Sequence, residues 1–421
     1  MSEKTILIWF RNDLRIHDNE VLIEAVNRAG KILPVYCFDP RYFTETSYGT
    51  RKSGYYRTKF LLESVEGLRE ALKERGGNLI IRIGKPEDVL PELCKQYGIS
   101  EVYHHREVAT EETEISTYVE DALWKLKINL KHFIGHTMLH KQDLPFPIKN
   151  IPNDFLIFKK KIERESIVRK GFDSPDKLEV PLDVEWGQLP LMEDLGIVIG
   201  ADIESDTLYT GGEKRALEIL DQLIDRSFSD FGLLKQNKGN SVVLSPWLSL
   251  GCLSPRLVYW KVKEKLPPKS DLSIKIIIEL QWRDFNRFML KKHGTVLDYS
   301  LEKLKPAENV KFINWKEGHT GEHLVDACMQ QLNETGYISN ICKSFVSSYL
   351  IKKLKIQWLA GSAYFEEKAI DFSHAIDWGN WAMVSDVIAY EKYANPGKEE
   401  IIEDQQIKNR LIYLEQPNKS A

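Results

Sequence analysis

The feature that most constrains the fold is an alternation of short apolar runs with helical patterns over the first third of the chain. When a helix connects each strand to the next, the connection crosses over the sheet and the two strands run parallel. This order therefore predicts a parallel sheet with helices on both faces. The expected strands span residues 5–10, 32–38, 79–83, 101–105 and 130–134, and the expected helices 19–28, 53–75, 86–97 and 110–126.

The turn after the first expected strand excludes one common use of such a sheet. Dehydrogenases place Gly-x-Gly-x-x-Gly there, because glycine lets the backbone approach a pyrophosphate closely. This chain instead has the polar stretch Phe10-Arg-Asn-Asp-Leu-Arg15. We therefore do not expect a dehydrogenase-type dinucleotide site.

The pattern changes twice after the α/β domain, which we place at residues 1–135. Six prolines interrupt residues 136–210, a connector with helical character only at 153–170. Residues 211–390 are almost wholly helical in pattern, and the charged tail at 391–421 is expected to be partly disordered or loosely docked. The expected fold class is an N-terminal α/β domain with a five-stranded, parallel, doubly wound sheet, followed by an all-α C-terminal domain. Its helices are expected at 212–226, 246–250, 255–265, 273–292, 321–335, 338–352, 361–370 and 378–390.

Composition indicates a globular protein of 421 residues with a net charge of −4, which argues against a wholly basic nucleic-acid-binding surface but allows a local groove. The five cysteines are odd in number and lack the close spacing of a metal site, so we expect reduced thiols, no metal and a cytoplasmic location. The first strand begins within a few residues of the N-terminus, so no signal peptide is expected. No apolar stretch reaches the roughly 18 residues of a membrane span.

Two segments carry polar groups in helical contexts. In Glu279-Leu-Gln-Trp-Arg-Asp-Phe285, the positions of Glu279, Trp282 and Arg283 place an acid, an indole and a guanidinium on one helix face, which Arg287 extends. A surface ion pair beside a half-buried Trp is one interpretation; a cleft in which Trp282 stacks on a planar ligand is the other.

The second segment is Asp371-Phe-Ser-His-Ala-Ile-Asp-Trp-Gly-Asn-Trp381. Acids that follow a helix end are poorly placed for the helix dipole, so they need a cationic or hydrogen-bond-donating partner. Lys343 and Arg283 are the candidates. Trp358 and Trp381 lie on neighbouring helical segments and could touch, although two core indoles need no function.

These segments resemble the photolyase/cryptochrome family, and most closely its cryptochrome DASH branch. The likeness runs from Ile6 to about Val387. It is carried by Trp9-Phe-Arg-Asn-Asp-Leu-Arg-Ile-His-Asp-Asn19, His136-Thr-Met-Leu-His-Lys-Gln-Asp-Leu-Pro-Phe146, Ser245-Pro-Trp-Leu-Ser-Leu-Gly-Cys-Leu-Ser-Pro-Arg256, Gly318-His-Thr-Gly321, Gln331-Leu-Asn-Glu-Thr-Gly336 and Asp377-Trp-Gly-Asn-Trp381.

The resemblance implies an FAD cofactor in the helical domain, with a folate (methenyltetrahydrofolate) at the α/β domain as an optional antenna. It further implies blue-light-driven electron transfer that repairs cyclobutane pyrimidine dimers in single-stranded or damaged DNA. By this resemblance the cofactor-binding residues are Ser241, Ser245, Arg283, Asn340, Lys343, Asp371, Ser373 and Asp377. Glu279, Trp282 and Asn340 meet the flipped-out lesion, Trp381 and Trp358 form an electron relay, and Glu111 contacts the antenna.

The cavity also departs from the family pattern. Ile341 and Lys343 replace two arginines, Ser373 replaces a second acid, and Asp377 stands where Asn is usual. The acid at 377 is similar to that of plant cryptochromes, where it can protonate the flavin. Met383 replaces an aromatic residue, and Lys305 stands near the place of a third, surface tryptophan.

Three functions follow from these features. The first is the repair activity, for which the basic groove would be formed by Arg283, Arg287, Lys291 and Lys343. The second is a blue-light photoreceptor or regulatory nucleic-acid-binding protein without repair, which Asp377 favours. The third is a degenerate family member that has lost FAD; a coloured purified protein would exclude it. Protein partners are not indicated.

Overall fold

Five parallel strands form the centre of the N-terminal half in the computed structural model, which describes residues 4–198, 209–225, 244–294 and 309–385. Their order in the sheet is β3-β2-β1-β4-β5. This confirms the predicted parallel sheet. The strands span Thr5–Phe10 (β1), Lys31–Phe38 (β2), Ile80–Ile83 (β3), Glu101–His105 (β4) and Asn129–Phe133 (β5).

Alternate side chains of β1 face two different layers of helices. Ile6, Ile8 and Phe10 pack in one core with α1 and α2, whereas Leu7 and Trp9 pack in another with α3 and α4. All six residues of β1 are buried, as a central strand covered on both faces requires. The covering helices span Glu20–Arg28 (α1), Tyr55–Lys73 (α2), Pro86–Gln96 (α3) and Thr110–Trp124 (α4), and the 3₁₀ turn η1 spans Pro40–Phe43.

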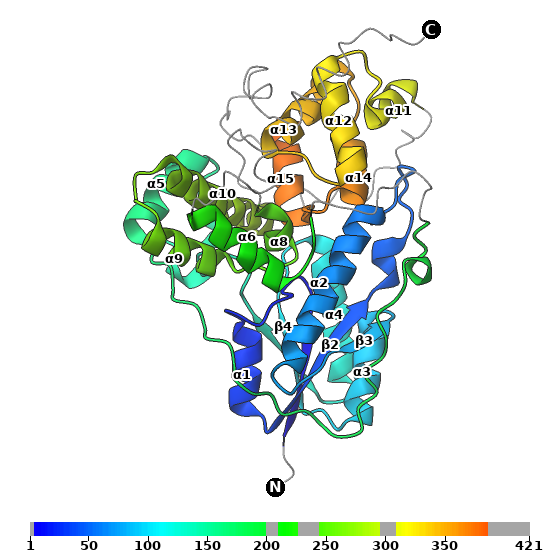
Figure 1. The fold of residues 1–421 in the computed structure, drawn as a ribbon, viewed down its shortest axis with the longest axis vertical. Coiled ribbons are helices and arrows are strands. Elements are labelled where there is room, and N and C mark those ends of the chain that lie inside the picture. The colour runs from blue at the N-terminus through cyan, green and yellow to red at the C-terminus, as the bar shows by residue number, and fades with distance from the viewer. Residues whose placement is uncertain (1–3, 199–208, 226–243, 295–308, 386–421) are drawn as a thin grey trace.

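The connector is mostly irregular and leads into the helical half, which lies over one end of the sheet (Figure 1). Its elements are η2 (Lys141–Asp143), η3 (Ile148–Asn150), α5 (Phe155–Glu165) and η4 (Glu193–Leu195). The helical half contains α6 (Glu213–Asp225), α8 (Ser245–Ser249), α9 (Pro255–Lys265), α10 (Asp271–His293), α11 (Val310–Glu317), α12 (His323–Thr335), α13 (Asn340–Ser348), the π-helical turn η6 (Tyr349–Lys353), α14 (Trp358–Lys368) and α15 (His374–Val384).

Several helix boundaries differ from the prediction, and two of the observed starts are marked by local hydrogen bonds. The helix expected at 338–352 begins only at Asn340, because Ser339 caps it by accepting a hydrogen bond from the Cys342 N–H. The last helix begins at His374 rather than 378, and Asp377 accepts a hydrogen bond from the Ser373 N–H at its start. In the part of the chain that is described, no helix is long and apolar enough to cross a membrane.

Buried ion pairs join the two halves. The Arg256 guanidinium at the start of α9 contacts both oxygens of Asp18, at 3.0 Å and 2.7 Å. Arg15, which is fully buried, donates to the carbonyl oxygens of His17, Asp18, Gly135 and Gly251. Residues of the loop after β1 therefore bind both the sheet half and the helical half through buried side chains.

Candidate functional site

A buried cluster of one cation and two carboxylates lies where α13 meets the turn between α14 and α15. Lys343 Nζ lies 2.6 Å from Asp371 Oδ1 and 3.8 Å from Asp377 Oδ1. Ser245 donates a hydrogen bond of 2.8 Å to Asp371, and the Ser373 N–H donates one of 2.8 Å to Asp377. The pairing of Lys343 with the acids after α14 is thus observed, whereas Arg283 does not take part in it.

The charges in this cluster depend on one another. Burial raises the pKa of Asp377 to about 6, and the Lys343 ammonium only partly offsets this. Burial lowers the pKa of Lys343, but Asp371 and Asp377 outweigh it, so the net shift is upward. Near neutral pH the site therefore holds a charged lysine beside two carboxylates, of which Asp377 takes up a proton as the pH falls through about 6.

The acid and the indole predicted to meet a lesion lie together on α10. The Trp282 ring packs edge-on against Phe155 at a centroid distance of 4.8 Å, and its Nε1–H donates to Asn380 Oδ1 at 3.1 Å. Glu279 is half-buried, and burial raises its pKa to about 8 despite the positive charge of Lys275. Aromatic packing and one hydrogen bond therefore fix the Trp282 ring. With a pKa of about 8, the Glu279 carboxyl is mostly protonated at pH 7 and can donate a hydrogen bond.

Arg283 and Arg287 point into the interior instead. Arg283 donates to the carbonyl oxygens of His136 and Leu248, and Arg287 Nη2 lies 2.9 Å from Glu107 Oε2. Their exposed fractions are only 6% and 5%. The shared helix face was predicted, but its two arginines serve the interface between the halves of the chain in this structure.

The two tryptophans of the predicted relay lie on adjacent helices, α14 and α15, and both are buried. Trp381 contacts the rings of Phe365 and Trp315, at 5.4 Å and 6.5 Å, and Trp358 contacts Trp378 at 6.5 Å. Gly361, one turn after Trp358, lies directly against the Trp381 ring, where a Cβ would collide. Trp315 was not singled out from the sequence, although it lies only three residues before the segment Gly318-His-Thr-Gly321.

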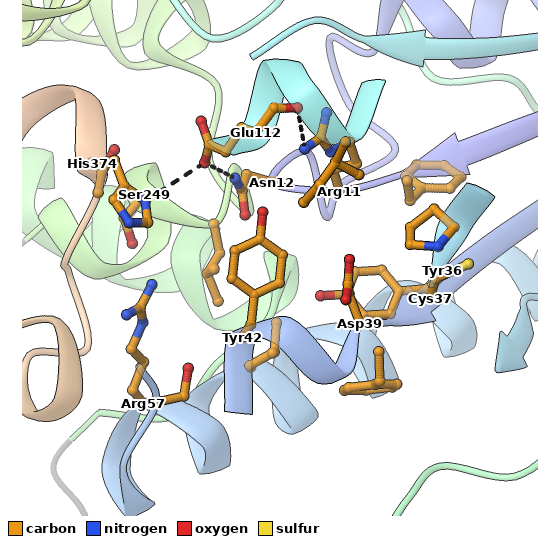
Figure 2. Close-up of a pocket in the computed structure, with 18 of the residues that line it drawn as sticks. Arg11, Asn12, Tyr36, Cys37, Asp39, Tyr42, Arg57, Glu112, Ser249 and His374 are labelled. Atoms are coloured by element: carbon orange, nitrogen blue, oxygen red, sulfur yellow. Dashed lines mark hydrogen bonds and ion pairs between the residues drawn. The ribbon is translucent and has the colours of Figure 1, made fainter. Parts of the chain in front are cut away.

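A pocket opens at the carboxyl ends of β1 and β2 and reaches the turn before α15 (Figure 2). Ligands of parallel sheets commonly bind at this edge. Glu111, predicted as an antenna contact, forms an ion pair with Lys52, whereas its neighbour Glu112 lines the pocket. Other polar lining residues are Arg11, Asn12, Asp39, Tyr42, Ser53, Arg57, Ser249, Ser373 and His374.

The remaining predicted residues are exposed, half-buried or outside the described part of the chain. Asn340 is exposed at the first position of α13, and Lys291 is exposed near the end of α10. Met383 is half-buried on α15. Ser241, Lys305 and the tail at 391–421 lie outside the described residues.

Comparison with known proteins agrees with the observed sheet and helical half. Residues 6–177 match the family model of DNA photolyase, and residues 276–408 match the FAD binding domain of DNA photolyase. The chain is 38% identical over 398 residues to the cryptochrome DASH of Gloeobacter violaceus, with 90% of this chain and 79% of that protein covered. It is also 38% identical over 403 residues to the cryptochrome DASH of Xenopus laevis, covering 90% and 76%.

A solved cryptochrome from Synechocystis sp. PCC6803 superimposes with a TM-score of 0.86 at 34% identity, covering 98% of this chain and 89% of that one. A class III photolyase from Agrobacterium tumefaciens shares the fold, with a TM-score of 0.79 at 24% identity and coverages of 99% and 91%. The chain belongs to the photolyase/cryptochrome family.

The residues of the buried cluster fit the polar edge of a flavin. Asp371 and Asp377 are buried, and the Lys343 side chain between them is only 11% exposed, which is costly in a core that holds no polar ligand. Among the described side chains, Arg283 Nε and Asn286 Nδ2 are buried without a hydrogen-bond partner. These donors are of the kind that the carbonyl and ring-nitrogen acceptors of a flavin could satisfy.

Proposed function

We propose that the protein binds FAD and uses blue light to drive electron transfer that repairs cyclobutane pyrimidine dimers in single-stranded DNA. The observation that carries the proposal is that Glu279 and Trp282 lie one turn apart on α10, in the same helical half as the cluster of Lys343, Asp371 and Asp377. The match to the FAD binding domain of DNA photolyase and the similarity to cryptochrome DASH proteins support it.

In this proposal Ser245, Lys343, Asp371, Ser373 and Asp377 would hold the cofactor, with Ser241, Arg283 and Asn340 as further contacts. FAD would supply light absorption and a transferable electron. The chain's own residues position the reaction: Trp282 offers a flat wall for an extruded base, and neutral Glu279 donates a hydrogen bond to it. Trp381 and Trp358 are proposed as electron relay residues.

The direct test is repair by the purified protein. An oligonucleotide with one cyclobutane dimer is supplied as a single strand or as a duplex, in blue light or in darkness. We expect the dimer to be lost from the single strand in light and retained in darkness. Purified protein that shows no flavin absorption after reconstitution with FAD, and no repair, would contradict the proposal.

Lesion binding should depend on the proton of Glu279. Its pKa of about 8 means that the neutral, donating form is present below that pH and is lost as the pH rises through 8. We expect the affinity for dimer-bearing single strands to fall between about pH 7 and pH 9. In Glu279→Gln, which stays neutral, the affinity should be flat over this range; an equal fall in the variant would assign the pH dependence to another group.

A second function, blue-light signalling without repair, is favoured by Asp377. Its pKa of about 6 would let Asp377 take up a proton beside the proposed flavin edge as the pH falls below neutral, 3.8 Å from Lys343 Nζ. The repair assay separates the two functions: a flavin-loaded protein that changes its absorption on illumination yet leaves the dimer intact would be a photoreceptor.

The pocket at the carboxyl ends of β1 and β2 is our proposed site for an antenna. Arg11, Arg57 and His374 contribute cationic groups to its lining, and a folate carries carboxylates that such groups can bind. Glu111 is the sequence neighbour of Glu112, which lines the pocket, and stays a predicted contact of the antenna. A fluorescent pterin released on denaturation of the purified protein would support a folate.

Binding to single-stranded DNA should be weakened by salt because phosphate contacts release counterions. Of the four cations predicted to form the groove, Lys291 is the exposed one, whereas Arg283 and Arg287 are buried and the Lys343 side chain is only 11% exposed. We therefore expect Lys291→Ala to reduce the slope of log affinity against log salt by about 0.7. Lys352→Ala, on another exposed helical face, should leave the slope unchanged; a slope that Lys291→Ala does not alter would remove Lys291 from the interface.

A further inference from the structure

Three titratable side chains form a row that connects the α/β half to the helical half beside the pocket. Glu112 belongs to α4, Glu366 to α14, and His374 is the first residue of α15. His374 Nε2 lies 3.0 Å from Glu366 Oε1, and His374 Nδ1 lies 4.0 Å from Glu112 Oε1. All three are buried, and Figure 2 shows Glu112 between Asn12 and His374.

Glu112 shares its surroundings with a second buried carboxylate, Glu107. The Asn12 Nδ2 group lies 2.9 Å from Glu107 Oε1 and 3.4 Å from Glu112 Oε1. Glu107 has Arg287 at 2.9 Å and His136 at 3.3 Å, so it keeps its charge and its pKa is lowered in spite of burial. Burial and the charge of Glu107 raise the pKa of Glu112 to about 7. Glu112 is thus the member of the pair that gains or loses a proton.

His374 is held as a cation from its other side. Burial opposes its charge, but Glu366 outweighs burial, so the pKa of His374 is raised and that of Glu366 is lowered. Arg57 completes the surroundings of the row: it donates a 2.6 Å hydrogen bond to the Glu366 carbonyl oxygen and lies over the Phe372 ring. The remaining charged groups that act on the row are Arg11, Lys52 and Arg287.

The row ends in the turn that carries the buried cluster. His374 directly follows Ser373, whose N–H donates to Asp377, and lies three residues after Asp371. Any displacement of the His374 backbone therefore moves the hydrogen bond of Asp377 and the carboxylate that contacts Lys343.

We propose that His374 is a positioning residue for the turn at 371–377, and that it transmits proton binding at Glu112 to the carboxylates facing Lys343. While Glu112 is neutral, His374 keeps its ion pair with Glu366 and the turn is fixed. When Glu112 releases its proton into the pocket, the new buried anion attracts the imidazolium toward α4 and away from Glu366, and the turn loosens. That this turn borders a flavin rests on the proposed function; the coupling itself does not.

The test is hydrogen exchange of the full-length protein in the dark, followed by mass spectrometry for the peptide covering residues 369–378. After correction for the intrinsic effect of pH, exchange should accelerate by roughly tenfold between about pH 6 and pH 8.5, the order expected from one pKa unit of coupling. Glu112→Gln, which cannot ionise, and His374→Gln, which cannot become charged, should both abolish the acceleration. Glu114→Gln, which removes an exposed acid of the same helix outside the row, should keep it.

The proposal would be overturned if exchange in Glu112→Gln accelerated with pH as much as it does in the wild type. If either variant does not fold, ¹³C-glutamate spectra of the wild type decide: a Glu112 carboxyl that shows no titration between about pH 5 and pH 8.5 also overturns it. Neither measurement needs flavin or light, so a failure of the proposed repair function would leave both results unaffected.

Discussion

Replacing Lys343 with methionine should cost about 3–5 kcal/mol of unfolding free energy, because it leaves Asp371 and Asp377 buried without their cation. Such a loss is a large part of the stability of an ordinary domain. The loss should shrink at acid pH. Asp377 already has a raised pKa, so the unpaired acids bind protons as the pH falls and the penalty of burying their charge disappears. Urea denaturation at about pH 5 and pH 8 measures both effects.

Two matched variants separate the loss of the buried charge from the effect of replacing any lysine. Lys343→Arg keeps the charge and should lose much less, while Lys352→Met, on an exposed part of η6, should change stability by less than about 0.5 kcal/mol. If Lys343→Met were as stable as the wild type at pH 8, the two carboxylates would have another partner and the cluster would not depend on the lysine.

Replacing Asp18 with asparagine should also cost about 3–5 kcal/mol, because the Arg256 guanidinium then stays buried without a counter-charge next to Arg15. The backbone is not the cause, since Asp18 has a positive φ of 45° that asparagine tolerates well. Burial opposes the charge of Asp18, but Arg15 and Arg256 outweigh it and lower its pKa, so the wild type should lose this contribution only as the pH falls below about 4.

The control for Asp18 is a pair of the same chemistry at the surface. Arg169 contacts both oxygens of Asp143, at 2.6 Å and 2.9 Å, but its side chain is 44% exposed. Asp143→Asn should therefore cost no more than about 1 kcal/mol. Equal losses in the two variants would show that burial does not govern the Asp18 pair.

The sheet could be predicted from the sequence because its strands are covered on both faces. In β1 every residue is buried, so the apolar run is continuous and its boundaries, Thr5 and Phe10, were found correctly. The last helices were less predictable. The start of α15 is marked by the hydrogen bond from the Ser373 N–H to Asp377, whose carboxylate also faces Lys343 of α13. The contact with Lys343 joins two distant segments, and a local pattern does not contain it.

The candidate site was predictable only where its residues are close in sequence. Helical spacing correctly placed Glu279 and Trp282 side by side on α10, but it could not show that Arg283 turns toward the carbonyl oxygens of His136 and Leu248. The row of Glu112, His374 and Glu366 was missed altogether. Its members come from α4, α15 and α14, and their chemistry appears only when the two halves of the chain meet.

The bidentate pair of Asp18 with Arg256 has a consequence for how this architecture can change over evolutionary time. A sheet half joined to a helical half without Arg256 would leave Asp18 buried at the junction without its counter-charge. A helical half joined to a sheet half without Asp18 would leave the Arg256 guanidinium unpaired in the same way. A chimaera that joins this sheet half to another helical half should therefore keep its stability only where both partners of this salt bridge are present.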